Sequence, residues 1–207
     1  ELWRAQPHTP VMRKILLVNG HQPFPSSPGR LNATFTERAR QAFLAGRAEV
    51  ESVAVADAWD VETQIGLQLW ADFVLYQFPL NSMGPPWSLK RYLDEVFTAG
   101  MDGRLARGDG RTRSDPSRPY GSGGRMQGRS YALSLTMNAP RGAFDDPDAP
   151  LFKGRSVDDL LAPLHINFAF FGLAQRPGFV AHDVAKNSRI AADLERFDAY
   201  LADLMTD

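Results

Sequence analysis

The chain has 207 residues, a length that favours one domain with a sizeable core. Its 23 lysines and arginines nearly balance 24 aspartates and glutamates, so the composition indicates neither nucleic acid nor an anionic membrane as a partner. The chain contains no cysteine, which excludes disulfides and thiolate chemistry and fits a cytoplasmic protein. No apolar run reaches the ~18 residues of a transmembrane helix, so no membrane insertion is expected.

The first eleven residues show no periodic pattern and lack the apolar core of a signal peptide. Met12 stands directly before the first predicted strand. We therefore expect residues 1–11 to be a cloning remnant or an extended N-terminus, and residues 12–207 to form a single domain.

A strand, a polar loop and a helix follow one another near the start of the chain. Residues 15–18 form a continuous apolar run of the kind that a buried parallel strand needs. Residues 21–30 are rich in proline, serine and glycine, and apolar residues then recur at helical spacing over residues 31–43. Because a helix N-terminus offers unpaired N–H groups and partial positive charge, we interpret this loop as the phosphate-binding part of a cofactor site. The alternative is an ordinary connection in which Ser26 or Ser27 helps to cap the helix.

Strands and helices alternate through the rest of the chain. Further strands are predicted over residues 49–55, 71–78, 131–136 and 178–181. Further helical segments are predicted over residues 89–97, 157–171 and 188–205, and residues 60–69 form a polar connector that is compatible with a helix. This alternation predicts an α/β fold with a doubly wound, five-stranded parallel sheet of order 2-1-3-4-5 between two layers of helices.

Unusual loops follow the strands that such an order places at its ligand-binding edge. Ligands bind at the carboxyl ends of strands 1, 3 and 4, where the chain changes direction across the sheet. The loops after those strands are residues 21–30, residues 80–87 and the segment that begins at Met137. Residues 103–129, rich in glycine and arginine, form a long stretch without predicted helix or strand, which is typical of a functional or disordered segment.

Several short blocks of sequence resemble one family. They are Ser27 to Asn32, Gln77 to Leu80, Met83 to Lys90, Asp109 to Arg113, Tyr120 to Gly124, Leu133 to Thr136 and Asn138 to Pro140. Together they resemble the flavodoxin-like NAD(P)H:quinone oxidoreductases, and within them the bacterial modulator of drug activity B branch. The resemblance runs from about Lys14 to the C-terminus, and the Tyr-Gly-Ser-Gly-Gly and Asp-Gly-Arg-Thr-Arg blocks are its most specific parts.

The resemblance implies an activity, its cofactors and an assembly. It implies an FAD-dependent oxidoreductase that takes a hydride from NADPH, or NADH, and passes two electrons to a quinone in an alternating, ping-pong scheme. It also implies a homodimer with its sites at the interface, and the segment 103–129 and the aromatic-rich helix over residues 163–171 suit that assembly. No metal site is predicted, because the four histidines are scattered without clustered carboxylates.

The resemblance also implies the site residues. Those that would hold the FAD diphosphate and its surroundings are Ser27, Pro28, Gly29, Arg30, Leu31, Asn32, Ala33, Thr34 and Phe35. Those that would lie along the isoalloxazine ring are Pro79, Leu80, Asn81, Ser82, Met83 and Gly84, and those at its polar edge are Thr136, Met137, Asn138 and Ala139. Tyr120 would close the site over the cofactor and is the one catalytic candidate.

The sequence departs from the family pattern in two places. Asn81 and Ser82 stand where the family usually places an aromatic beside the flavin, so we expect a wider space above the ring. Phe144 and Lys153 stand near the positions of a Tyr and a His that assist hydride transfer in eukaryotic members. Because a Phe cannot donate a hydrogen bond, no catalytic pair is carried over. His21, by contrast, matches a histidine of the eukaryotic members.

Two other functions remain open from the sequence. One is an FMN-dependent azo- or nitro-reductase of the same fold, and the other is a flavodoxin-like protein that binds flavin or a partner without turnover. Arg111 and Arg113 are candidates for contact with the 2′-phosphate of NADPH, with a solvated loop as the alternative.

Overall fold

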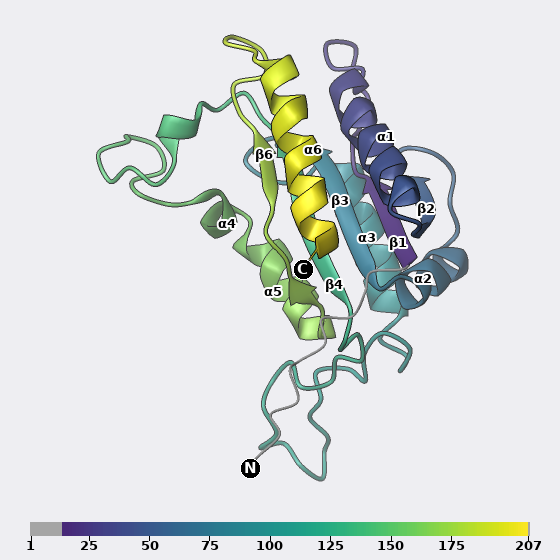
Figure 1. The fold of residues 1–207 in the computed structure, drawn as a ribbon. Coiled ribbons are helices and arrows are strands. Elements are labelled where there is room, and N and C mark those ends of the chain that lie inside the picture. The colour runs from purple at the N-terminus through teal and green to yellow at the C-terminus, as the bar shows by residue number, and fades with distance from the viewer. Residues whose placement is uncertain (1–13, 207) are drawn as a thin grey trace, which may run out of the picture.

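The computed structural model describes residues 14–206, so the expectation for residues 1–11 lies outside the described residues. A parallel sheet runs through the centre of the molecule in the order β2-β1-β3-β4-β5, with β6 also paired to β4 (Figure 1). The strands are β1 (Lys14–Asn19), β2 (Glu49–Ala54), β3 (Phe73–Pro79), β4 (Ser130–Thr136), β5 (Ala174–Gln175) and β6 (Phe179–Ala181). The predicted sheet order is therefore confirmed.

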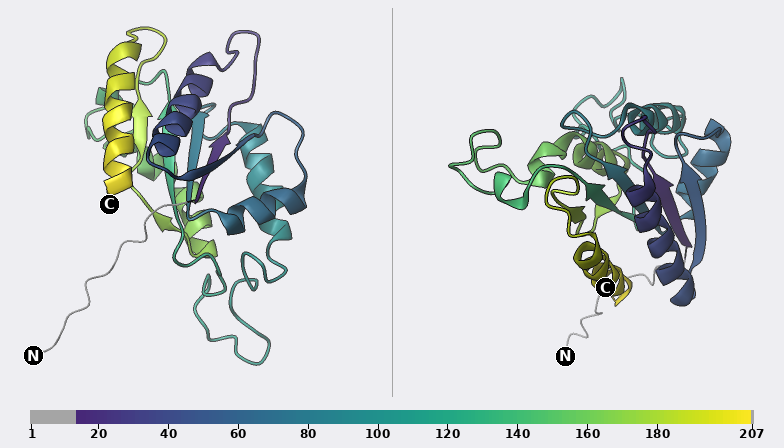
Figure 2. Two further views of the ribbon diagram at one scale, coloured as in Figure 1. Left: turned by 45° about the vertical axis from the view of Figure 1, so that its right-hand side comes forward. Right: turned by 90° about the horizontal axis from the view of Figure 1, so that it is seen from above.

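Helices cover both faces of the sheet, as predicted. They are α1 (Arg30–Ala45), α2 (Val61–Trp70), α3 (Trp87–Ala99), α4 (Val157–Leu160), α5 (Ala162–Phe171) and α6 (Ile190–Thr206), with a short 3-10 turn η1 (Arg141–Ala143). Figure 2 shows α1 and α6 on one face, and α3 and α5 on the other. Successive strand residues point to opposite faces, so Phe73 and Leu75 pack under α1 and α6, whereas Val74 and Tyr76 pack under α3 and α5.

Two elements differ from the prediction. The fifth position of the sheet is shared by two short strands, because β5 pairs with the start of β4 and β6 pairs with its end. Pro177 lies between them and has no N–H group with which to continue the ladder. The helix predicted over residues 157–171 is interrupted at Leu161, since Pro163 at the start of α5 cannot donate a helical hydrogen bond to the preceding turn.

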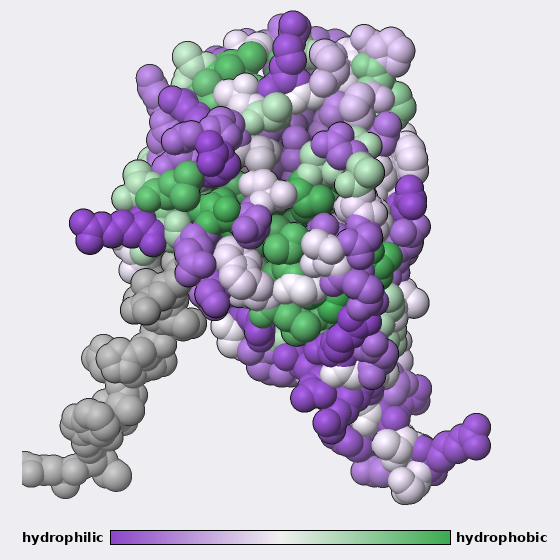
Figure 3. Space-filling model, turned by 90° about the vertical axis from the view of Figure 1, so that its right-hand side faces the viewer, coloured by the Kyte–Doolittle hydropathy of each residue, from purple (hydrophilic) through white to green (hydrophobic). Residues whose placement is uncertain are grey.

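The long segment between α3 and β4 lies beyond the end of the sheet at which the strands begin (Figure 1). Backbone hydrogen bonds order it, including those from Arg107 N to Gly123 O (2.8 Å) and from Gly121 N to Asp109 O (2.9 Å). Figure 3 shows its projecting end as a hydrophilic surface. Among the described helices, none combines the length and apolar character required to cross a bilayer.

Candidate functional site

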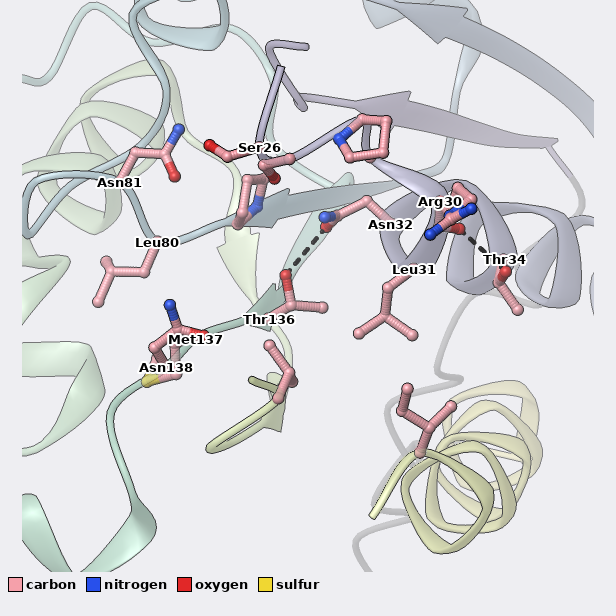
Figure 4. A pocket seen from close by; sticks show the side chains of 16 residues that line it. Ser26, Arg30, Leu31, Asn32, Thr34, Leu80, Asn81, Thr136, Met137 and Asn138 are labelled. Carbon is pink, nitrogen blue, oxygen red and sulfur yellow. Dashed lines mark hydrogen bonds between the residues drawn. The ribbon is translucent and has the colours of Figure 1, made fainter. Parts of the chain in front are cut away.

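A cavity of about 590 Å³ lies at the carboxyl end of the sheet, where the loops after β1, β3 and β4 meet (Figure 4). Its volume is in the range of small-molecule and cofactor sites. The first loop contributes Ser26, Ser27, Pro28, Gly29, Arg30, Leu31, Asn32 and Thr34; the second Pro79, Leu80 and Asn81; and the third Thr136, Met137 and Asn138. The segment between β6 and α6 adds Val184, and the first residue of α6 adds Ile190. Three segments that are distant in sequence and were predicted to form one site are thus brought together.

The N-terminus of α1 opens into this cavity without a side-chain cap. Gly29 is the N-cap residue, with φ at 83°, and no side chain caps the N–H groups of the first turn, so neither Ser26 nor Ser27 caps the helix. The first helical bond runs from Ala33 N to Gly29 O (2.9 Å). The N–H groups before it therefore lack intrahelical acceptors and, with the partial positive charge of the helix end, form an anion-binding surface.

His21 holds the loop that leads to this helix end. Its side chain is buried and its Nε2 lies 3.1 Å from Ser27 O, to which the neutral ring donates. Burial lowers the pKa of His21 from its ordinary value, which keeps the ring uncharged at neutral pH. A Cβ atom at Gly29 would collide with the same ring. The His21 ring therefore packs directly against the backbone of residue 29, which leaves room for glycine and for no residue with a side chain.

A buried polar network fixes the first turn of α1 to the sheet. Asn32 Oδ1 accepts hydrogen bonds from Gln77 Nε2 (2.9 Å) and from Thr136 Oγ1 (3.3 Å). Gln77 Oε1 in turn accepts from Ser134 Oγ (2.6 Å). These side chains come from α1, β3 and β4, so the network sets the height of the helix N-terminus above the floor of the cavity. Figure 4 shows the part of it that joins Asn32 to Thr136.

The turn after β3 brings only part of the expected ring-contact segment to the cavity. Asn81 and Gly84 exchange two backbone hydrogen bonds of 2.9 Å across a tight turn. Ser82 and Met83 occupy the centre of that turn with positive φ values of 47° and 65°. Asn81 lines the cavity, whereas Ser82, Met83 and Gly84 do not.

Three further predicted residues, Phe35, Ala33 and Ala139, do not line the cavity. Phe35 is buried between α1, the sheet and α6, with its ring 4.8 Å from that of Phe197. Ala33 lies on the exposed face of α1, and the Ala139 carbonyl accepts from Asp183 N (3.2 Å).

Of the backbone groups expected at the polar edge of the ring, Met137 N–H is already used, because it donates to Ala181 O (2.9 Å). Within the described part of the chain no acceptor is recorded for Asn138 N–H, which leaves this donor beside the cavity.

Tyr120 lies far from the cavity of its own chain. It belongs to the segment at the opposite end of the sheet (Figure 1), where its ring is 5.6 Å from that of Phe170 on α5 and lies under the guanidinium of Arg111 at 5.3 Å. Its side chain is 73% exposed. Tyr120 therefore cannot close the cavity of the subunit to which it belongs.

The structure also adds residues that sequence reasoning missed. Val184 and Ile190 give the cavity an apolar margin beside α1, and Ser26 extends the first loop. The sequence signal for Val184 and Ile190 was their position after the last strand, at the same edge of the sheet.

Phe144 is buried and stacks on Phe152 with ring centroids 4.2 Å apart, so this place in the chain holds an apolar cluster. Within residues 14–206 no group of three or more potential metal ligands is found.

Comparison with known proteins identifies the family. The model of a family described by its flavodoxin-like fold matches residues 13–203. The NADPH:quinone oxidoreductase MdaB of Haemophilus influenzae is 38% identical over 187 residues, which cover 90% of this chain and 96% of the relative.

Solved structures agree on the fold. A candidate quinone reductase from Klebsiella pneumoniae superposes with a TM-score of 0.74 at 19% identity, covering 93% of this chain and 85% of that one. The general stress protein 14 of Treponema denticola, solved in complex with FMN, superposes with a TM-score of 0.61 at 20% identity, covering 94% of this chain and 98% of that one. The chain belongs to the flavodoxin-like fold family, in the branch that contains the NADPH:quinone oxidoreductase MdaB.

Proposed function

We propose that the protein is an FAD-dependent NAD(P)H:quinone oxidoreductase. The observation that carries this proposal is the uncapped N-terminus of α1, which opens into a cavity formed by the loops after β1, β3 and β4. The relation to MdaB supplies the activity, and the geometry of this chain supplies a place for its cofactor.

The lining residues fit the parts of a flavin dinucleotide. The free N–H groups of α1 and the guanidinium of Arg30 would hold the diphosphate. Leu80, Asn81 and Met137 would hold the ring system, and the N–H group of Asn138 would stabilise negative charge at its polar edge. Bound FAD would supply hydride chemistry, while these residues position it and exclude water from it.

FAD is preferred to FMN because of the apolar margin formed by Val184 and Ile190. Val184 lies in the segment between β6 and α6, and Ile190 is the first residue of α6, which packs beside α1. Both side chains would cover an adenine ring beyond the diphosphate. The second candidate is an FMN-dependent reductase, which the FMN complex of the Treponema denticola protein favours. Chromatography of the heat-released cofactor tests the choice: recovery of FAD supports the proposal, and FMN as the only tightly bound flavin contradicts it.

In the proposed arrangement, NADPH and quinone would enter the flavin cavity in turn and react over the same cofactor. We therefore propose an alternating scheme in which the first product leaves before the quinone enters. Initial-rate measurements with both substrates varied should give parallel double-reciprocal lines. Intersecting lines would show that both substrates bind together, and no NADPH-dependent quinone reduction by the flavin-loaded protein would indicate a binding protein without turnover.

We further propose a homodimer in which Tyr120 of one subunit closes the cavity of the other. Helix α5 is rich in apolar residues on all sides, and Ile166 remains 68% exposed on its outer surface. Tyr120 packs against Phe170 of the same helix, so one continuous apolar surface joins the helix to the long segment. Two-fold pairing of such surfaces is the commonest way to bury them, and light scattering at micromolar concentration should show a dimer.

Mixed dimers test whether Tyr120 acts across the interface. A Tyr120→Ala subunit keeps an intact cavity, and a Gly29→Val subunit keeps Tyr120 but loses the helix N-terminus that the cofactor needs. Each variant alone should have low activity, whereas mixed dimers should regain activity because one cavity then faces an intact tyrosine. Failure of mixing to restore activity, with mixed dimers shown by native mass spectrometry, would contradict the proposal.

A further inference from the structure

A second cavity, of about 400 Å³, lies within the long segment between α3 and β4. Four arginines line it: Arg107, Arg111, Arg118 and Arg125. No aspartate, glutamate or lysine shares the lining. We call it the arginine cavity.

Most of the positive charge in the arginine cavity is uncompensated. Arg111 is paired with Asp109, with 2.6 Å between Nη2 and Oδ2. Arg125 donates to the neutral carbonyl of Gly103 (2.8 Å) and so keeps its charge. Within the described residues, no hydrogen bond or ion pair is recorded for the side chains of Arg107 and Arg118. Like charges gathered in this way repel one another, and an anion that binds among them relieves the repulsion.

The backbone around the cavity is held in a fixed conformation. Arg107 N donates to Gly123 O, and Ala106 pairs with Gly124 in a bridge. Gly110 and Gly123 pack so closely that a Cβ atom on either would collide with the backbone of the other segment. The guanidinium groups are therefore carried by a frame that a ligand need not order, which lowers the entropic cost of binding.

We propose that the arginine cavity binds the 2′-phosphate of NADPH whose nicotinamide lies in the partner subunit's flavin cavity. The inference rests on the proposed function and dimer. The flavin cavity has Arg30 as its one charged lining residue, and the proposed function assigns that residue to the flavin diphosphate. Arg111 joins the arginine cavity to Tyr120 through its contact with the tyrosine ring, so closure by Tyr120 would place the arginines beside the mouth of the partner's site. The three terminal oxygens of a phosphate monoester dianion can accept paired hydrogen bonds from several arginine guanidinium groups at the same time.

Replacing the side chain of Arg107 or Arg118 tests the proposal, because neither side chain makes a hydrogen bond or ion pair with another described residue whose loss would affect the fold. Arg107→Gln and Arg118→Gln should each lower the ratio of kcat/KM for NADPH to kcat/KM for NADH by about 10-fold, since hydrogen bonds to charged groups contribute that much. Arg113→Gln is the matched control, because Arg113 is exposed in the same segment but does not line the cavity. Its ratio should stay unchanged.

Direct binding separates this inference from the proposed function. In calorimetry the dimeric holoprotein should bind adenosine 2′,5′-bisphosphate more tightly than adenosine 5′-monophosphate, and Arg107→Gln should remove the difference. Equal affinity for the two probes, or an unchanged NADPH to NADH ratio in both variants, overturns the inference even when quinone reduction is intact. Binding of inorganic phosphate with no such ratio change identifies a free-phosphate site and also overturns it. If the protein reduces no quinone, the proposed function fails, and the calorimetric difference still decides the phosphate site.

Discussion

Gln77, near the carboxyl end of β3, donates its side-chain amide to Asn32 in the first turn of α1 over 2.9 Å. Both side chains are buried, at 2% and 4% exposure. A hydrogen bond between two buried neutral groups contributes a modest amount to stability, but its loss leaves polar atoms without partners. The bond therefore fixes where the anion-binding helix end lies above the sheet, and its geometry matters more to the cavity than its energy does.

Gln77→Leu should lower both stability and cofactor retention. The substitution leaves Asn32 and Ser134 without a shared partner in the core, which should cost about 1–3 kcal/mol of the free energy of unfolding, measured in urea. The flavin dissociation constant should rise, because the helix end is no longer held.

A matched control for Gln77 exists on the other face of the sheet. Gln68 is equally buried and links Tyr76 to Tyr92 away from the cavity. Gln68→Leu should destabilise the fold by a comparable amount with little change in flavin affinity. Equal losses of affinity in both variants would mean that the network acts only through global stability.

Gly29→Ala should abolish tight cofactor binding. An added Cβ meets the buried His21 ring, and φ at 83° is a conformation that alanine rarely adopts. Gly128→Ala is the control, since Gly128 has φ at 81° but open space around its Cβ position. Flavin content after purification should fall for Gly29→Ala and stay full for Gly128→Ala. Equal losses of flavin in the two variants would show that backbone strain, and not the His21 contact, dominates, and loss in Gly128→Ala alone would contradict the role of Gly29.

Stability should decrease on mild acidification in part because of His21. Burial lowers the pKa of the folded-state ring from 6.5, so the unfolded chain takes up the proton more readily as the pH falls. The stabilisation is complete above the unfolded pKa and is lost as the pH falls through 6.5 towards the lower folded-state value. His182 shares the direction of this shift, mainly through burial.

His21→Gln retains a neutral donor but cannot titrate, so its free energy of unfolding should decline less than that of the wild type between about pH 7 and about pH 5. Urea unfolding at a series of pH values measures this, with His182→Gln as a comparison for the second group. Parallel pH profiles for wild type and His21→Gln would assign the acid sensitivity to other residues.

Asn81→Trp should change quinone preference without releasing the flavin. Asn81 lines the cavity, whereas Ser82 lies in the turn beside it with φ at 47°, so the former is the better position for an added ring. The indole should exclude bulky quinones while the diphosphate loop remains intact. Steady-state kcat/KM for a one-ring and a three-ring quinone should diverge by about 10-fold or more, the discrimination that a filled pocket provides. An equal effect on both quinones would show that this side chain does not define the space above the ring.

The sequence predicted those parts of the fold that depend on local patterns. Continuous apolar runs gave β1, β3 and β4, and helical spacing gave α1, α3 and α6. The short strand β5 was missed because Ala174 and Gln175 are exposed and carry no strand pattern. The break before α5 could have been anticipated from Pro163, which ends helices in most contexts.

The site was predictable where its residues are contiguous. Residues 27–32 and 79–81 line one cavity, because each loop is anchored by the strand before it, and their contact with a cofactor stays a prediction. Val184 and Ile190 reach the cavity only through tertiary packing, to which no local pattern points. The resemblance of the Tyr120 motif to the family placed this residue at the cofactor site without saying which subunit's site it closes. Its segment precedes β4, and a segment that precedes a strand must lie at the amino end of a parallel sheet, away from the cavity of the same subunit.

Neither border of the sheet offers a template for a further strand. β2 carries Glu49 and Glu51 on its exposed positions, and charged side chains discourage edge-to-edge pairing. At the other border β5 and β6 are two and three residues long and are separated by a segment that contains Pro177. Folded copies of this chain are thus directed to associate through helices and loops, and even at high concentration they are protected against the cross-β polymerisation that an open, regular border would invite.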